Sequence, residues 1–381
     1  MLPPFYQACL SAQLSETQFL TLEMLIQLLQ TERQVSIERL ATCFAQPILF
    51  ESRRRNLQRF LILPQLSPQA LWFPILKHWL KKHCHRGQAL RLVIDRTSWQ
   101  HHNLLMVSLV YDKRAIPLFW HLLDHQGQSN LAEQQRVLRP VLRLLRSYAV
   151  LVLGDREFHS VALGQWLEQM EVSFVLRLPC STTVKLNEQT DFERLDQLPQ
   201  YPGCNSFEVQ VRVTQQRGFG RFNLVTRWKR VYRTDKANQV WYLLTNLESL
   251  EFALEHYACR FSIEAMFRDY KTGGYQMEAT QANDERFLAL VLLMAIAYTT
   301  ATEQGKQIRK KGIAKYIARV KEPKRVERRH SDFWLGLYGS LWVESMQVWG
   351  ELAAQLMALK PQKRSFYLRG LRAMSLIQAA L

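Results

Sequence analysis

The sequence predicts a mixed α/β core with a β-rich insertion, set between helical regions at the two ends of the chain. Before about residue 88, apolar side chains recur at helical spacing, as in TQFLTLEMLIQLLQT. After Gly87, short β-like runs replace that spacing, and helical and strand-like segments then alternate. More strand-like runs follow before the last helices. We expect five regions, at residues 1–88, 89–178, 179–248, 249–304 and 305–381.

The composition indicates a folded protein that binds an extended polyanion. The 381 residues are 48% apolar, enough for two or three domains with cores of their own. A formal net charge of +17 favours nucleic acid or an anionic membrane surface as partner. The longest apolar run, residues 287–298, is too short to span a bilayer and predicts a buried helix. Six cysteines without a CxxC pair fit a reducing cytoplasm, and we expect no membrane contact.

The N-terminal helical region carries a basic segment, ESRRRNLQRFL. A helix with arginines at one-turn spacing beside apolar residues suits contact with a phosphate backbone. A basic face in solvent explains the same pattern equally well. The candidate DNA-binding residues of this segment are Arg53, Arg54, Arg55 and Arg59.

The predicted core begins with three closely spaced strands, ALRLVIDRTSW, NLLMVSLVYD and AIPLFWHLL, for which an antiparallel meander is the simplest pairing. A helix follows, with Asn130 as candidate cap and Pro140 inside it. The run AVLVLGD then predicts a strand buried on both faces, and SVALGQWLEQM and SFVLRL add a helix and a strand. This element order is that of the ribonuclease-H-like fold.

Two aspartates lie at informative places in this order. Asp95 lies within the first apolar strand, and Asp155 directly follows the fourth, at the carboxyl end where α/β sheets place their sites. An ionised aspartate in an apolar strand requires a partner or a bound cation. A partner for Asp95 could be Arg96 or Arg156, and Asp155 could instead cap a helix. Each aspartate alone is therefore compatible with a structural role.

The predicted insertion alternates cations with aromatic rings along FEVQVRV, RFNLVTRWKRVYR and VWYLLTNL. Such alternation suits single-stranded or distorted DNA, because cations hold phosphates while rings stack on bases. The exposed face of an ordinary sheet is the alternative. The residues concerned are Arg212, Arg217, Phe219, Arg221, Phe222, Arg227, Trp228, Lys229, Arg230, Tyr232 and Arg233.

Residues 255–275 predict a helix with a polar stripe, bounded by Ser249 as N-cap and by a Gly-Gly stop. Tyr257, Arg260, Glu264 and Lys271 project to about 0°, 300°, 340° and 320° at 3.6 residues per turn. A core-facing stripe is normally apolar, so this one indicates a functional site or an inter-domain salt-bridge face.

The C-terminal region begins with a strongly basic segment. Residues 306–329 hold eleven Lys and Arg against two Glu, which indicates phosphate attraction or a flexible tail. Trp334, Trp342 and Trp349 then recur at helical spacing and predict a packed helical end.

Asp95, Asp155 and Glu264 together match the needs of two-metal phosphoryl transfer. Carboxylate oxygens hold two Mg²⁺ ions roughly 3.5–4 Å apart, where one ion activates the nucleophile and the other stabilises the leaving oxygen. We expect two Mg²⁺ per site, replaceable by Mn²⁺, and three carboxylates ionised at neutral pH.

These residues resemble the DDE transposases of the insertion-sequence-four type. The pattern Y-x2-R-x3-E-x6-K, from Tyr257 to Lys271, looks like that family's signature, and VIDRTSW and LGDREFHS are similar to its two aspartate regions. HQGQSNLAEQQ and FRDYKTGGYQME are also similar to it. The resemblance covers roughly residues 45–300, including the place of the insertion.

The resemblance implies a cut-and-paste DNA transposase, acting in the bacterial cytoplasm on the terminal inverted repeats of its element and on target DNA. It implies 3′-end nicking, a hairpin intermediate and strand transfer at one metal site, within a homodimer. A flipped base would stack on Trp228 or Trp241, of which Trp228 is preferred for its flanking cations. The implied catalytic metal ligands are Asp95, Asp155 and Glu264, and the implied phosphate contacts are Tyr257, Arg260, Lys271 and Arg156.

Three other functions fit parts of the sequence. A domesticated relative would bind DNA without cutting it, but its expected mark is a lost carboxylate, and all three are present. A ribonuclease-H-like endonuclease such as a junction resolvase needs neither the polar stripe nor so large an insertion. A transcription factor is supported only by the basic N-terminal region.

Overall fold

The computed structural model describes residues 2–85, 87–187, 190–214, 220–229, 240–320, 322–323 and 328–379. The chain forms two compact units. One is a helical unit of Met1–His78 and Arg268–Leu381, and the other is a sheet unit of Trp79–Phe267. The division into five regions stays a prediction.

The sheet unit contains one mixed sheet in the order β3-β2-β1-β4-β5-β10-β9-β8-β6-β7. Its strands are β1 (Ala89–Trp99), β2 (His102–Tyr111), β3 (Arg114–Leu122), β4 (Ala149–Gly154), β5 (Ser173–Arg177), β6 (Thr183–Lys185), β7 (Glu193–Arg194), β8 (Asn205–Val213), β9 (Gly220–Arg227) and β10 (Trp241–Thr245). Its helical segments are α6 (Leu131–Leu144), η2 (Arg156–Phe158), α7 (Val161–Gln169), η3 (Leu195–Gln197) and α8 (Leu250–Ala258). Two further helices, α5 (Phe73–His83) and α9 (Phe261–Tyr270), cross the boundaries between the units.

The first half of this sheet confirms the predicted element order. β1, β2 and β3 form the antiparallel meander, while β4 and β5 run parallel to β1. Asn130 begins α6 with a capping box, because its side chain accepts from the Glu133 N–H while the Glu133 carboxylate accepts from the Asn130 N–H. Pro140 lies inside α6 as expected.

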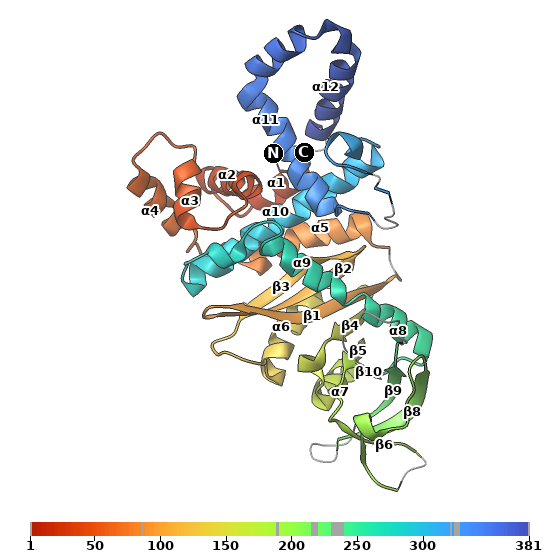
Figure 1. Cartoon of the computed structure of the whole chain (residues 1–381). Coiled ribbons are helices and arrows are strands. Elements are labelled where there is room, and N and C mark those ends of the chain that lie inside the picture. The colour runs from red at the N-terminus through yellow and green to blue at the C-terminus, as the bar shows by residue number, and fades with distance from the viewer. Residues whose placement is uncertain are drawn as a thin grey trace. The chain divides into compact units, whose positions relative to one another are not determined.

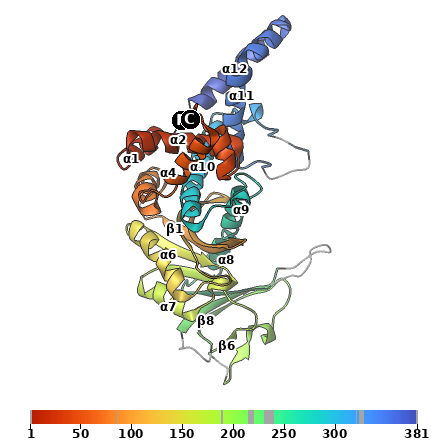
Figure 2. The same ribbon diagram turned by 90° about the vertical axis from the view of Figure 1, so that its left-hand side faces the viewer.

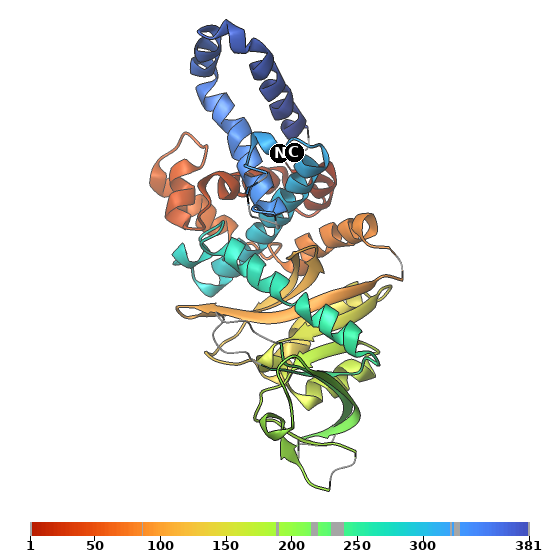
Figure 3. The same cartoon turned by 45° about the vertical axis from the view of Figure 1, so that its right-hand side comes forward.

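The strands of the predicted insertion continue the same sheet, because β10 pairs with β5 and then with β9. Within the sheet unit, α6 and α7 cover one face, and α8 and α9 run across the other (Figures 1 and 2). Figure 3 shows α8 and α9 passing over β1 and the strands beside it. The carboxyl ends of β1 and β4 therefore lie beside α8 and α9.

The helical unit packs around α10 (Asp284–Lys310). By length and composition α10 could cross a membrane, but 89% of its most apolar window is buried inside the protein, as expected of a core helix. A Cβ on Gly305 would lie 1.7 Å from the Asp332 carbonyl oxygen, so only glycine permits the close approach to α11. The other helical segments are α1 (Pro4–Ser11), α2 (Glu16–Glu32), α3 (Ile37–Cys43), α4 (Phe50–Phe60), η1 (Pro68–Trp72), η4 (Met277–Ala279), η5 (Ala314–Tyr316), α11 (Asp332–Ala358), η6 (Pro361–Lys363) and α12 (Arg364–Gln378).

The prediction of a fully packed C-terminal end is wrong for the second half of α11. Trp334 and Trp342 pack against other residues of the helical unit, but α11 kinks at Trp349, whose side chain is mostly exposed. Four more large apolar residues of α11 and its end are exposed, because the described residues of the helical unit do not cover this part of the helix. They are Val348, Leu352, Leu356 and Leu359.

Candidate active site

Asp95 and Asp155 lie side by side because β1 and β4 are parallel and in register. Ile94 pairs with Gly154, and the next residues are Asp95 within β1 and Asp155 directly after β4. Gly154 is required there, since a Cβ would lie 2.8 Å from the Phe158 Cβ. Backbone N–H groups hold both carboxylates: Arg96 donates to Asp95 Oδ1 and Glu157 donates to Asp155 Oδ1, each at 2.8 Å. Asp155 thus caps η2, which was its structural alternative.

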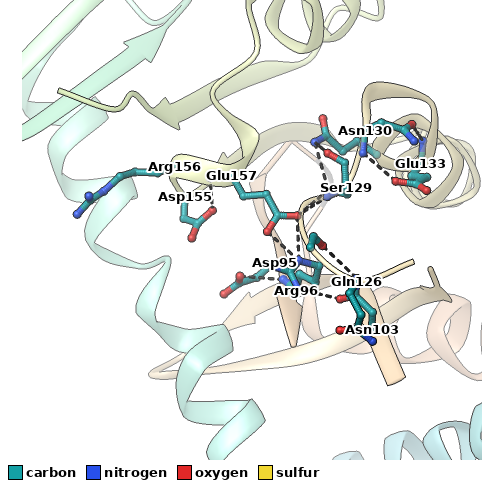
Figure 4. A network of polar contacts seen from close by, with 12 residues as sticks. Asp95, Arg96, Asn103, Gln126, Ser129, Asn130, Glu133, Asp155, Arg156 and Glu157 are labelled. Atoms are coloured by element: carbon teal, nitrogen blue, oxygen red, sulfur yellow. Dashed lines mark hydrogen bonds and ion pairs between the residues drawn. The ribbon is translucent and has the colours of Figure 1, made fainter. Parts of the chain in front are cut away.

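A network of hydrogen bonds and an ion pair connects the segments that carry Asp95 and Asp155. Arg96 Nε donates to Glu157 Oε2 at 2.9 Å, while the N–H and hydroxyl of Ser129 donate to Glu157 Oε1 at 2.9 and 2.8 Å. Arg96 also donates to Asn103 Oδ1 at 2.8 Å, so the network links β1, β2, η2 and the segment before α6 (Figure 4). The Arg96 side chain therefore pairs with Glu157 instead of Asp95. Sequence reasoning missed Glu157, although it lies two residues after Asp155.

The predicted single helix with a four-residue polar stripe is wrong. Ser249 does cap α8, but α8 ends at Ala258 and α9 begins at Phe261, with Arg260 in the turn between them. The N–H groups of Arg260 and Ile263 donate to carbonyls three residues back, so the backbone tightens here and the helical projection fails. α9 then ends at Tyr270, before Lys271. Tyr257, Arg260 and Glu264 nevertheless belong to one site, because tertiary contacts join them.

Arg260 lies between the carboxylates of Glu264 and Asp95. Its guanidinium lies 2.6 Å from Glu264 Oε1 and 3.7 Å from Asp95 Oδ2. The side chains of Arg260 and Asp95 are 7% and 14% exposed, whereas that of Glu264 is 48% exposed. The two buried charges therefore compensate each other, while Glu264 faces solvent. We call Asp95, Asp155 and Glu264 the carboxylate cluster.

The electrostatics of the carboxylate cluster correct one expectation. Burial, followed by the negative charge of Asp155, raises the pKa of Asp95 to about 7. The Arg96 N–H and the Arg260 guanidinium act in the opposite direction, without cancelling the shift. Burial and Asp155 therefore favour the protonated form of Asp95 in the metal-free protein, whereas the sequence predicted an ionised carboxylate.

Aromatic and cationic side chains adjoin the carboxylate cluster. Tyr257 is fully buried, and its ring lies edge to face with Trp241 at 5.0 Å and 5.9 Å from the Arg260 guanidinium carbon. Arg177 is the last residue of β5. Because Gly154 pairs with Leu176, Arg177 lies level with Asp155 across the sheet, and Asp155 lies level with Asp95 in the same way. Burial lowers the pKa of the Arg177 guanidinium, and Arg156 and Arg260 lower it further, whereas Tyr257 opposes the shift.

Sequence reasoning did not identify Arg177, because this residue comes level with Asp155 only when β4 and β5 pair. Arg156 follows Asp155 directly, but its side chain points away from both aspartates (Figure 4).

Lys271 and Trp228 have contacts of their own. Lys271 belongs to the helical unit and pairs with Glu278 at 2.8 Å. The Trp228 backbone exchanges hydrogen bonds with Gly203 and Cys204. Several residues of the basic, aromatic alternation lie outside the described residues, namely Arg217, Phe219, Arg230, Tyr232 and Arg233. Lys321, Lys324 and Arg325 of the basic C-terminal segment also lie outside them.

The four arginines of α4 divide into two pairs. The Arg53 side chain donates to the carbonyls of Ala41 at 2.7 Å and Ile48 at 2.6 Å, so it holds the segment between α3 and α4. Arg54 pairs with Glu38 at 3.3 Å. Arg55 and Arg59 are both exposed.

Carboxylates on two neighbouring strands and a covering helix, with guanidinium groups around them, are the side chains that metal-dependent phosphoryl transfer requires. The profile of the transposase DDE domain family matches residues 86–300, more than half of the chain, and the chain belongs to this family. It is thus a DDE-type transposase, a class that generally uses divalent metal ions.

Among solved structures, the chain is similar to a cryo-EM structure of the piggyBac transposase synaptic complex with hairpin DNA. The identity is 12% and the TM-score 0.42, covering 90% of this chain and 77% of that chain. No curated protein matches the chain.

Proposed function

We propose that this protein is a cut-and-paste DNA transposase of the insertion-sequence-four type, with the carboxylate cluster as its catalytic site. The observation that carries the proposal is that Asp95 and Asp155 lie on neighbouring parallel strands and that Arg260 joins Asp95 to Glu264 near the start of α9. The strand order β3-β2-β1-β4-β5 supports a ribonuclease-H-like core. We propose 3′-end nicking, a hairpin intermediate and strand transfer as its reactions, within the bacterial cytoplasm.

The carboxylate cluster fits divalent metal ions, and we propose that it binds two Mg²⁺, replaceable by Mn²⁺. All its donors are carboxylate oxygens, which Mg²⁺ prefers. Burial, and then the negative charge of Asp155, raise the pKa of Asp95, and a bound cation would stabilise its ionised form. Bound ions would supply Lewis-acid stabilisation of the attacking and leaving oxygens. Asp95, Asp155 and Glu264 would be their ligands.

Arg260 offsets this negative charge in the described structure. Its guanidinium compensates Asp95 and Glu264 directly. Cation-bound carboxylates would need Arg260 less, which would leave its donors available for a DNA phosphate. Arg177 and Arg156 are further phosphate contacts in this proposal, and Tyr257 is a hydrogen-bond donor. Lys271 stays a proposed contact to the transferred strand.

Trp241 is a better candidate than Trp228 for stacking on a flipped base. Its indole lies against Tyr257, and the Arg227 guanidinium carbon lies 5.5 Å from its ring. An aromatic ring beside a cation is the arrangement that holds an unstacked nucleotide. Trp228 lacks a described contact with the carboxylate cluster.

The central test is loss of cleavage when a carboxylate is replaced. The substrate is a duplex carrying the inverted repeats that flank the gene, with MgCl₂ present. Asp155→Asn should reduce end nicking by roughly 10³-fold or more, because several kcal/mol of charge stabilisation are removed. Glu168→Gln, an exposed change on α7, should retain cleavage. Cleavage by Asp155→Asn near the wild-type rate would refute the site, and cleavage without strand transfer would indicate an endonuclease.

We also propose a homodimer, supported by the exposed stripe on α11. Leu352, Leu356 and Leu359 are each more than half exposed and follow the 4-3 spacing of a coiled-coil seam after the kink at Trp349. Two copies of one such helix can cover each other symmetrically. In light scattering, Leu352→Glu with Leu356→Glu should convert a dimer into a monomer, whereas Gln347→Glu should not. A dimer that survives the double change would place the interface elsewhere.

A further inference from the structure

Asp95 and Asp155 are each held by a backbone N–H group, and the two residues that supply these groups form an ion pair. The Arg96 N–H donates to Asp95 Oδ1 at 2.8 Å. The Glu157 N–H donates to Asp155 Oδ1, also at 2.8 Å. Arg96 Nε lies 2.9 Å from Glu157 Oε2. We infer that this ion pair sets the separation of the two aspartates, and through it the metal affinity of the carboxylate cluster.

The Arg96 side chain lies on the opposite face of the sheet from Asp95. Successive residues of a strand point to opposite faces, and both residues belong to β1. Asp95 faces Arg260, between α8 and α9. Arg96 pairs with Glu157, which in turn accepts hydrogen bonds from Ser129 just before α6 (Figure 4). Arg96 and Glu157 are therefore positioning residues, which act on the metal ligands through the backbone.

The Glu157 carboxylate has its hydrogen-bonding partners inside the protein. Its Oε1 accepts from the N–H and the hydroxyl of Ser129 at 2.9 and 2.8 Å, and Arg96 Nε donates to both of its oxygens. Gln134 donates in turn to the Ser129 carbonyl at 3.2 Å. The Glu157 side chain is 10% exposed. A buried carboxylate with a counter-charge and several donors is fixed in position, so Glu157 serves as an anchor and not as a metal ligand.

Arg96 extends this anchor to β2. Its Nη1 donates to Asn103 Oδ1 at 2.8 Å, and the Asn103 amide donates to the carbonyls of His125 and Gly127 at 2.7 and 3.0 Å. Asn103 is fully buried. Hydrogen bonds within one network reinforce each other, so the loss of one member loosens the others. The network therefore fixes β1 and η2 relative to each other more firmly than the two N–H contacts alone.

The inference rests on the proposed function, which supplies the metal ligands. Metal affinity depends on where the ligands are held, and residues that orient ligands typically contribute about 10- to 100-fold. Glu157→Gln and Arg96→Gln each remove one charge of the pair but leave both backbone N–H groups in place. The test measures Mn²⁺ binding to the full chain without DNA, from the electron paramagnetic resonance signal of the free ion.

Each single variant should weaken Mn²⁺ binding about tenfold. The double variant Arg96→Gln with Glu157→Gln should weaken it by no more than that factor, because each side chain acts only through the other. Losses that multiply to about 100-fold in the double variant would show two independent effects and overturn the inference.

A second ion pair of similar burial provides the matched control. Arg309 Nε lies 2.6 Å from Asp332 Oδ1 in the helical unit, and the two side chains are 25% and 13% exposed. Asp332→Asn should lower thermal stability but leave Mn²⁺ affinity within about twofold of wild type, because independent sites contribute separately. Equal losses of Mn²⁺ affinity in Asp332→Asn and Glu157→Gln would indicate general destabilisation and overturn the inference.

Thermal unfolding in EDTA should show that Glu157→Gln folds. If it does not, Ser129→Ala, which removes one hydrogen bond and leaves the ion pair, should still weaken Mn²⁺ binding about fivefold. Wild-type affinity in Ser129→Ala would then overturn the inference. Failure of wild type to bind Mn²⁺ would refute the proposed metal site and the inference with it. Mn²⁺ binding by wild type that Glu157→Gln fully retains would overturn the inference alone and leave the proposed function standing.

Discussion

The carboxylate cluster and α4 both adjoin or hold arginines that the sequence predicted to contact DNA, but the surroundings of these arginines differ. Arg260 is buried and lies against Asp95 and Glu264, whereas Arg55 is exposed and has no described partner. The guanidinium of Arg260 therefore compensates charge within the protein, and its phosphate contact depends on a cation taking over that task. Arg55 carries charge that no ion pair among the described residues compensates.

The difference shows that residue type and spacing do not assign a DNA contact. Arg53 and Arg55 are two residues apart on one helix, yet Arg53 uses its donors on the carbonyls of Ala41 and Ile48. An arginine whose donors are satisfied inside the fold supports stability, and one whose donors remain available supports binding. The following predictions test this distinction.

The largest expected effect concerns Arg260. Arg260→Gln should destabilise the metal-free protein by roughly 2–4 kcal/mol, because it leaves Asp95 and Glu264 without their buried counter-charge. Thermal unfolding in EDTA measures the loss. Excess MgCl₂ should restore part of it, since cations can then offset the carboxylates.

Arg55→Gln is the contrasting variant, and it should change the free energy of unfolding by no more than about 0.5 kcal/mol. An Arg260→Gln variant as stable in EDTA as wild type would show that the ion pair contributes nothing. A loss of the same size with and without MgCl₂ would separate Arg260 from cation binding.

A smaller effect concerns the pH dependence of stability. Folding raises the pKa of Asp95 from 3.8 to about 7, so the folded state binds more protons than the unfolded state between these values. In EDTA, the stability contributed by this group should therefore fall as pH rises from about 4 to 7. Asp95→Asn removes the titration and should be more stable than wild type above pH 7, by at most about 4 kcal/mol.

Thermal unfolding at several pH values measures this difference. Asp191→Asn, an exposed change, serves as the control and should follow the wild-type profile. A profile for Asp95→Asn that parallels wild type would show that another group carries the pH dependence.

Much of the fold could be predicted because local sequence patterns specify its helices and strands. β1 to β5 and the caps at Asn130 and Ser249 follow from apolar runs, turn residues and side chains that bond the nearest N–H groups. Strand order placed Asp95, within β1, beside Asp155, which directly follows β4. The break between α8 and α9 carried no such signal, since no proline or glycine lies at residues 257–264.

By itself, the sequence determined the elements of the core and the identity of three candidate metal ligands, because periodicity and spacing are properties of neighbouring residues. Tertiary structure decided which charges compensate each other. The pairing of Arg260 with Asp95 and Glu264, the brace of Arg96 and Glu157 and the joining of Arg286 to α4 all link segments distant in the chain. Such contacts depend on folded distance and burial, which set the strength of every charge interaction.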